Sequence, residues 1–167
     1  MSELERTAWG LVDDAEREVE SISVEELRRE LERRERAEEG EAESGEESGD
    51  ANEHDDGGGN AGDDPVVVDI RDIREVWIEG SIPGAEHAPR GMIEFWADPE
   101  TEYYRDFFGP ERRYVLYCNE AGRSALAAKR LGEMGYGDVA HLEGGFTAWQ
   151  DAGGEVIDVP QKDYKSR

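Results

Sequence analysis

The sequence predicts an α/β fold in which helices cover both faces of a central parallel sheet. Three short apolar runs have the length and composition of strands buried on both faces: VVVDI (66–70), YVLYC (114–118) and DVAHL (138–142). Segments with helical spacing alternate with these runs, which indicates parallel strands joined by helical crossovers. The 167 residues suffice for one domain with a sizeable core.

Before the first buried run, residues 19–36 (VESISVEELRRELERRER) predict a short strand over 19–22 and then a helix. Ser23 and Glu26 have the spacing of a capping box, which marks the start of that helix. The apolar residues that follow the cap fall on one helical face: Val24, Leu27 and Leu31.

Residues 37–64 consist mainly of Glu, Asp, Gly, Ser, Ala and Asn and lack large apolar side chains. Nothing in this segment can be buried to offset the entropy of an ordered chain. We therefore expect an acidic, Gly-rich disordered insertion. A solvated surface insertion is favoured, since long loops are tolerated, and an acidic interaction tail is the alternative.

After the 66–70 strand, residues 71–80 predict a short helix that ends at Gly80. A Pro-Gly turn and a short extended piece are expected within 81–89. Residues 90–108 mix aromatic and acidic side chains, and we expect Pro99 to divide them into two helical pieces.

Two further helices are expected after the last two strands. Residues 124–136 have Ala and Leu at helical spacing and end at Gly135. Residues 144–153 form a shorter helix that a Gly-Gly pair closes.

The chain is strongly acidic: 43 Asp and Glu oppose 19 Lys and Arg, which gives a net charge of −24. Such a surface repels phosphates, so nucleic acids and anionic membranes are not expected as partners. Only three of the basic residues are Lys. High acidity with scarce Lys is typical of proteins from halophilic microbes, where salt screens the self-repulsion; a merely acidic mesophilic protein is the alternative.

The N-terminus, MSELERTAWG, lacks the pattern of a signal peptide, and no apolar run approaches the ~20 residues of a membrane helix. We therefore expect a cytoplasmic protein. A single cysteine excludes an internal disulfide, and neither a metal site nor a cofactor is expected. The sequence does not predict the oligomeric state.

Cys118, the single cysteine, ends a predicted strand and precedes a helix by a short loop. Active sites of parallel sheets lie at the carboxyl ends of strands. The N–H groups and dipole at the start of the following helix stabilise a thiolate, or an anion carried on the sulfur. The residues of this candidate site are Cys118, Asn119, Glu120, Ala121, Gly122, Arg123 and Ser124.

Within this loop, Gly122 is expected to permit a tight turn and Arg123 to supply a permanent cation. Ser124 is expected to cap the following helix and to hydrogen-bond the sulfur. The alternative for Cys118 is a small buried hydrophobe without reactivity.

Four blocks of sequence resemble a rhodanese domain, the domain of a sulfurtransferase family. They are VVVDIRD (66–72), GSIPGAEHAPRG (80–91), YVLYCNEAGRSALAAKRLGEMGY (114–136) and VAHLEGGFTAWQDAGGEV (139–156). ISVEELRREL (22–31) resembles the opening strand and helix of the same domain. The resemblance implies a three-layer α/β/α fold with a central parallel sheet of about five strands.

On this resemblance the rhodanese-like domain spans 19–156, interrupted by the insertion at 37–64. Residues 1–18 form an N-terminal extension, and residues 157–167 form a C-terminal tail.

The resemblance also implies a mechanism. Cys118 takes a sulfane sulfur from a small-molecule or protein donor as a persulfide, and the amides of 119–123 hold the terminal sulfur. A thiol or cyanide acceptor then removes that sulfur. Without a second cysteine, the acceptor must be external.

Loop length distinguishes related chemistries. Here four residues separate Cys118 from Arg123, whereas related phosphatases and arsenate reductases use a loop one residue longer. The sequence therefore favours sulfur transfer over that Cys-dependent alternative. A non-catalytic, regulatory binding module is the other alternative.

The loop departs from the family at two positions. Ala121 stands where many members have Gly, and Glu120 adds a negative charge that offsets Arg123. We therefore expect thiosulfate, a dianion, to be a poor donor.

Three charged residues elsewhere are possible supports of the site. Asp69 and Arg71 end the strand expected to neighbour the cysteine strand. They either line the active-site mouth or form an ion pair that fixes the next helix. Arg90 is expected near the same rim, and His141 is expected to be packed inside its strand.

Overall fold

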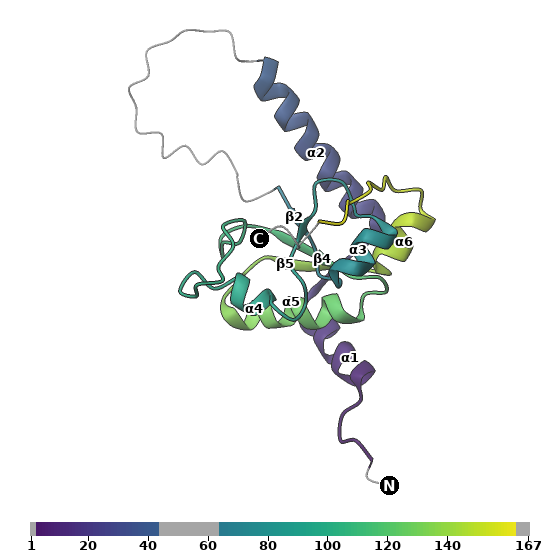
Figure 1. Ribbon diagram of the computed structural model, residues 1–167, viewed down its shortest axis with the longest axis vertical. Helices are drawn as coiled ribbons and strands as arrows, with labels where there is room; N and C mark the ends of the chain where they lie inside the picture. The colour runs from purple at the N-terminus through teal and green to yellow at the C-terminus, as the bar shows by residue number, and fades with distance from the viewer. Residues whose placement is uncertain (1–2, 44–63, 163–167) are drawn as a thin grey trace.

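The computed structural model describes residues 3–43 and 64–162, and its centre is an all-parallel five-stranded sheet (Figure 1). The strands lie in the order β1-β5-β4-β2-β3. The predicted α/β class and parallel sheet are confirmed. The strands are β1 (Glu20–Ile22), β2 (Val66–Asp69), β3 (Glu86–His87), β4 (Tyr114–Tyr117) and β5 (Val139–Leu142).

The helices occur in the described ranges as α1 (Ala8–Glu18), α2 (Val24–Glu43), α3 (Ile73–Glu79), α4 (Ile93–Trp96), α5 (Gly122–Met134) and α6 (Gly145–Asp151). No helix within those ranges is both long enough and apolar enough to cross a membrane.

The second helical piece expected before residue 108 does not form. Residues after Pro99 make turns instead. The Thr101 hydroxyl donates to the Phe95 and Asp98 carbonyls, and the Arg105 N–H donates to the Trp96 carbonyl. These bonds fold the chain back on α4.

Two apolar cores lie on opposite faces of the sheet, because successive strand residues point to opposite faces. Val66 and Val68 of β2 pack in the core that includes α4 and α5, whereas Val67 packs in the core that includes α2 and α6. Both faces are thus covered by helices, which explains the apolar runs in β2 and β4.

Helix α2 is longer than expected and continues through Glu43. The prediction of disorder is wrong for residues 37–43, and residues 44–63 lie outside the described residues. Glu, Arg and Ala are strong helix formers, and Arg34 pairs with Glu38 one turn later at 3.1 Å. Helix propensity therefore extends α2 beyond its last buried residue.

The N-terminal residues form helix α1, which packs on α5. The Thr7 side chain caps α1 by accepting a hydrogen bond from the Gly10 N–H at 3.0 Å. Val12 and Ala15 bury their side chains with Ala125 of α5. Helix α1 is thus placed against the helix that follows the cysteine loop.

Candidate active site

Cys118 lies directly after β4, at the carboxyl end of a central strand flanked by β5 and β2. Its side chain is 1% exposed. The Ala121 N–H donates a hydrogen bond to Sγ at 3.2 Å, and Sγ lies 3.6 Å from the Ser124 hydroxyl oxygen. The Ala121 N–H therefore stabilises a negative charge on the sulfur, whereas the Ser124 oxygen accepts from the thiol.

The turn of this loop rests on Ala121, which adopts a left-handed conformation with φ of 83°. Helix α5 begins at Gly122, so the prediction that Ser124 caps the helix is wrong. Ser124 lies in the first helical turn, where its hydroxyl donates to the Ala121 carbonyl at 3.1 Å. Gly122 serves close packing instead, since a Cβ placed there would lie 3.2 Å from the Trp9 ring.

Helix α6 supports the loop from its other side. The Phe146 and Thr147 N–H groups donate to the Cys118 and Asn119 carbonyls at 2.8 and 3.1 Å. Gly145 permits this approach: its φ is 59°, and a Cβ there would lie 2.6 Å from the Asn119 carbonyl oxygen. The GGF motif at the start of α6 thus holds the backbone of the cysteine loop.

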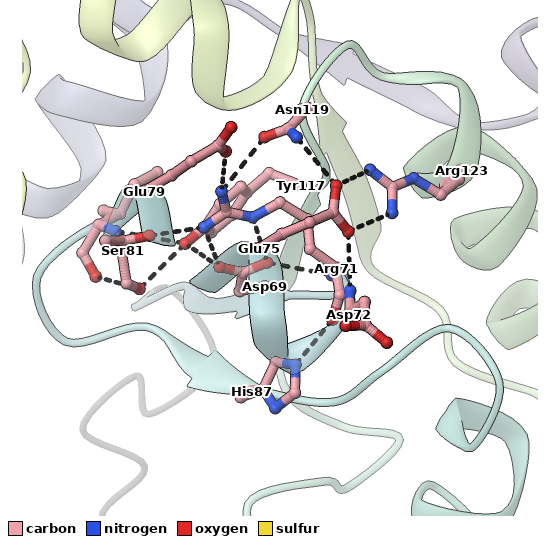
Figure 2. Close-up of polar contacts among 12 residues, drawn as sticks. Asp69, Arg71, Asp72, Glu75, Glu79, Ser81, His87, Tyr117, Asn119 and Arg123 are labelled. Carbon is pink, nitrogen blue, oxygen red and sulfur yellow. Dashed lines mark hydrogen bonds and ion pairs between the residues drawn. The ribbon is translucent and has the colours of Figure 1, made fainter. Parts of the chain in front are cut away.

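Glu75 of α3 connects three parts of the site (Figure 2). Its carboxylate accepts hydrogen bonds from the Asp72 N–H at 3.0 Å, from Asn119 Nδ2 at 3.0 Å, and from both terminal nitrogens of Arg123 at 2.8 and 2.9 Å. Hydrogen bonding to Arg123 lowers the pKa of Glu75 below its ordinary value. The carboxylate is therefore ionised at neutral pH.

The same pair determines what Arg123 can do. The hydrogen bond to Glu75 and the charge of that carboxylate, followed by the nearby Cys118, raise the pKa of the Arg123 guanidinium. Two of its nitrogens are already engaged by a carboxylate, and the neighbouring Glu120 is exposed. The cation of the loop is thus offset by two acidic side chains.

Asp69 and Arg71 form a buried ion pair beneath the loop, visible at the centre of Figure 2. Arg71 is 0% exposed and donates to Asp69 at 2.6 and 2.9 Å, to Glu79 at 2.9 Å and to Asn119 Oδ1 at 3.2 Å. The Tyr117 hydroxyl also donates to Asp69, at 2.8 Å. This network joins β2, α3 and the loop, as expected of an ion pair that fixes the following helix.

Arg90 follows β3, and its N–H donates to the Ile70 carbonyl, just after β2, at 2.9 Å. It pairs with Glu94 at 3.0 Å. It also lines, with Leu11 and Arg130, a surface pocket of about 370 Å³ beside α5.

Two residues near the loop were not predicted from the sequence. Glu75 is one, although Asp72 and Glu75 have the spacing of a capping box, which both side chains complete. Trp9 is the other: it packs against Gly122 yet remains 64% exposed, and only the contact between α1 and α5 places it there. No group of three potential ligands suited to a metal ion occurs among the described residues.

Known sulfurtransferases are among the proteins that resemble this chain. The chain is 34% identical over 95 residues to a sulfurtransferase from Allochromatium vinosum, which covers 57% of this chain and 80% of that protein. It is 32% identical over 96 residues to the thiosulfate sulfurtransferase GlpE from Pseudoalteromonas translucida, with 58% and 83% covered.

Among solved structures, a Rhodopseudomonas palustris protein described as of unknown function and a possible tyrosine phosphatase superposes with a TM-score of 0.69. It is 34% identical and covers 94% of this chain and 98% of its own. A polysulfide-sulfur transferase from Wolinella succinogenes shares the fold at 21% identity, with a TM-score of 0.58 over 92% and 89% of the two chains. The rhodanese-like domain family matches residues 51–152. The chain therefore belongs to the rhodanese-like domain family.

Proposed function

We propose that this protein is a sulfurtransferase that carries sulfane sulfur as a persulfide on Cys118. The main observation behind this proposal is the position of Sγ at the end of β4. There Sγ accepts a hydrogen bond from the Ala121 N–H and lies beside the Ser124 hydroxyl. The Ala121 N–H favours a negative charge on the sulfur, and the thiolate is the nucleophilic form of cysteine. The named sulfurtransferases among its relatives support this class of reaction.

The reaction has two half-reactions, as in covalent catalysis generally. In the first, the thiolate attacks the outer sulfur of the donor. The new S–S bond forms as the donor's bond to that sulfur breaks, and the leaving group keeps the electron pair. In the second, an external nucleophile attacks the terminal sulfur and regenerates the thiolate. Cys118 is the only cysteine, so no second thiol of the chain competes for the sulfur.

The charges around the loop bear on the choice of donor. Arg123 is paired with Glu75, and Glu120 is exposed in the same loop. A dianion such as thiosulfate must therefore approach two carboxylates to reach one neutralised cation. We expect a persulfide, on a small molecule or a protein, to be the better donor. The name of the Pseudoalteromonas translucida relative makes thiosulfate the reference donor to test against.

Phosphate ester hydrolysis is the second candidate, because the Rhodopseudomonas palustris structure is described as a possible tyrosine phosphatase. Two features oppose it. Only four residues separate Cys118 from Arg123. The guanidinium that an oxyanion would need is already bound in a bidentate pair with Glu75.

Intact mass spectrometry tests the proposal, with the full chain incubated with a small-molecule persulfide or with thiosulfate, at low and high salt. We expect a gain of one sulfur atom that cyanide removes and that Cys118→Ser lacks. The same preparations are given an aryl phosphate. Hydrolysis of the phosphate without sulfur gain would assign the chain to the second candidate. If the chain shows neither activity, a binding module is favoured instead.

A further inference from the structure

A buried histidine stands behind the cysteine loop. His141 lies in β5 and is 0% exposed, and its partner in β4, Leu116, packs in the same core as Cys118, so the ring faces the same side of the sheet as Cys118. Its Nδ1 lies 3.4 Å from the Ser124 hydroxyl oxygen, and its Nε2 lies 2.7 Å from the Ser21 hydroxyl of β1. Since Ser124 is also 3.6 Å from the sulfur, a chain of polar contacts runs from Cys118 to the neighbouring edge strand.

The hydrogen bonds assign the roles of the ring nitrogens. The Ser124 hydroxyl donates to the Ala121 carbonyl at 3.1 Å, so its oxygen acts as an acceptor toward the ring. Nδ1 therefore carries the hydrogen. In the neutral ring Nε2 is then an acceptor, and it receives the Ser21 hydroxyl.

We propose that His141 is a positioning residue for the sulfur, acting through Ser124. By donating Nδ1–H to the Ser124 oxygen, it holds that oxygen beside Sγ. The hydroxyl hydrogen is then free to turn from the Ala121 carbonyl toward the sulfur when the sulfur becomes anionic.

The arrangement works in both states of the sulfur. With a thiol, the Ser124 oxygen accepts from S–H and from His141 and donates to Ala121. With a thiolate, it keeps the bond from His141 and donates to Sγ, while the thiol proton passes to solvent. Only one hydroxyl rotates, and each state keeps its donors paired.

The surroundings favour a neutral ring. Burial lowers the pKa of His141, and the charge of Glu143 opposes this only in part. On α1, the Glu16 carboxylate lies 3.9 Å from Nε2 and is 42% exposed. Of the charged groups in the cysteine loop, Arg123 interacts with Cys118 and is paired with Glu75, and Glu120 is exposed. The ring therefore contributes a hydrogen bond rather than a second charge.

The test is the pH profile of Cys118 alkylation by iodoacetamide, followed by intact mass on the full chain. The single cysteine makes every adduct report the same sulfur. Losing a hydrogen bond to the thiolate moves the profile by about one pH unit, or roughly tenfold in rate below the midpoint. We expect His141→Leu to raise the midpoint by that amount. His141→Asn, whose amide N–H replaces Nδ1–H as the donor to Ser124, should keep the midpoint of the parent protein.

Ser124→Ala should raise the midpoint as His141→Leu does, and adding His141→Leu to Ser124→Ala should change nothing further. Tyr136→Phe is the matched control, since it removes a different buried hydrogen bond, to the Ala97 carbonyl at 2.7 Å. It should lower stability and leave the midpoint in place.

An unchanged midpoint in His141→Leu would overturn the proposal. So would a further shift of the midpoint when His141→Leu is added to Ser124→Ala. If His141→Leu does not fold, Ser124→Ala must still raise the midpoint and His141→Asn must not. The proposal rests on the proposed sulfur chemistry for its purpose, but alkylation needs no sulfur donor. If the midpoint shifts in His141→Leu but the parent chain forms no persulfide with any donor, the proposed function is wrong and the role of His141 still holds.

Discussion

Replacing Gly145 by Ala should separate the cysteine loop from helix α6. An Ala Cβ at this position would lie 2.6 Å from the Asn119 carbonyl oxygen and closer still to that of Cys118. Both atoms are backbone, so neither can rotate away as the end of a side chain would. The φ of 59° adds a second penalty, because L-residues other than Gly rarely adopt it.

The magnitude follows from these two effects. The left-handed conformation costs about 1–2 kcal/mol in a residue with a Cβ. Relieving the clash breaks the bonds from Phe146 and Thr147 to the loop, at about 1 kcal/mol each. We expect Gly145→Ala to lower the free energy of unfolding by ~3–4 kcal/mol, a large share of a typical domain's ~5–15 kcal/mol.

Gly153→Ala is the matched control. Gly153 has a φ of 74°, but a Cβ there would meet no atom within 4 Å. It therefore carries the conformational penalty alone. Urea unfolding followed by fluorescence should give ~2 kcal/mol more destabilisation for Gly145→Ala than for Gly153→Ala. Equal losses would refute the claim that α6 holds the loop by close approach of its backbone.

Three further predictions concern charges and strain. Glu75→Gln should strengthen thiosulfate binding, measured as a lower KM, because it frees Arg123. The substitution should also lower the free energy of unfolding by about 1 kcal/mol at neutral pH, and this loss should disappear in acid. The reason is that the Glu75 carboxylate, whose pKa is lowered in the folded state, stabilises the fold above its ordinary pKa and stops doing so as the pH falls through the lowered pKa. Arg113→Met should destabilise by about 3 kcal/mol in thermal or urea unfolding, because it leaves the Glu30 carboxylate, 12% exposed, without the partner 2.8 Å away; a loss within experimental error would argue against this. Ala121→Val should cost about 2 kcal/mol, since a β-branched residue tolerates a positive φ worse than Ala, whereas Ala121→Gly should stay within about 1 kcal/mol of the parent; equal stability of the Val variant would refute the strained turn.

The sequence by itself determined the layers of the fold. Continuous apolar runs such as VVVDI and YVLYC are sufficient to predict buried parallel strands, because a strand covered on both faces cannot alternate with polar residues. The position of Cys118 at the end of such a run also followed from local pattern. These features depend on neighbours along the chain, which the sequence lists directly.

Local pattern failed where composition and context disagreed. Residues 37–43 look unable to support a core, yet they continue α2, because helix propensity and pairs such as Arg34–Glu38 need no burial. The left-handed residue of the loop is Ala121 rather than Gly122, which instead begins α5 and packs against Trp9. Propensity alone favours the opposite assignment.

Only the tertiary structure decided which groups meet at the sulfur. Glu75 binds Arg123 from 48 positions away, and His141 reaches Ser124 from 17 positions away. No periodicity links such residues, because their contacts depend on strand order and on which face of the sheet each side chain occupies. The order β1-β5-β4-β2-β3 places β5 and β2 on either side of β4, and this places His141 on one side of Cys118 and the helix that follows β2 on the other.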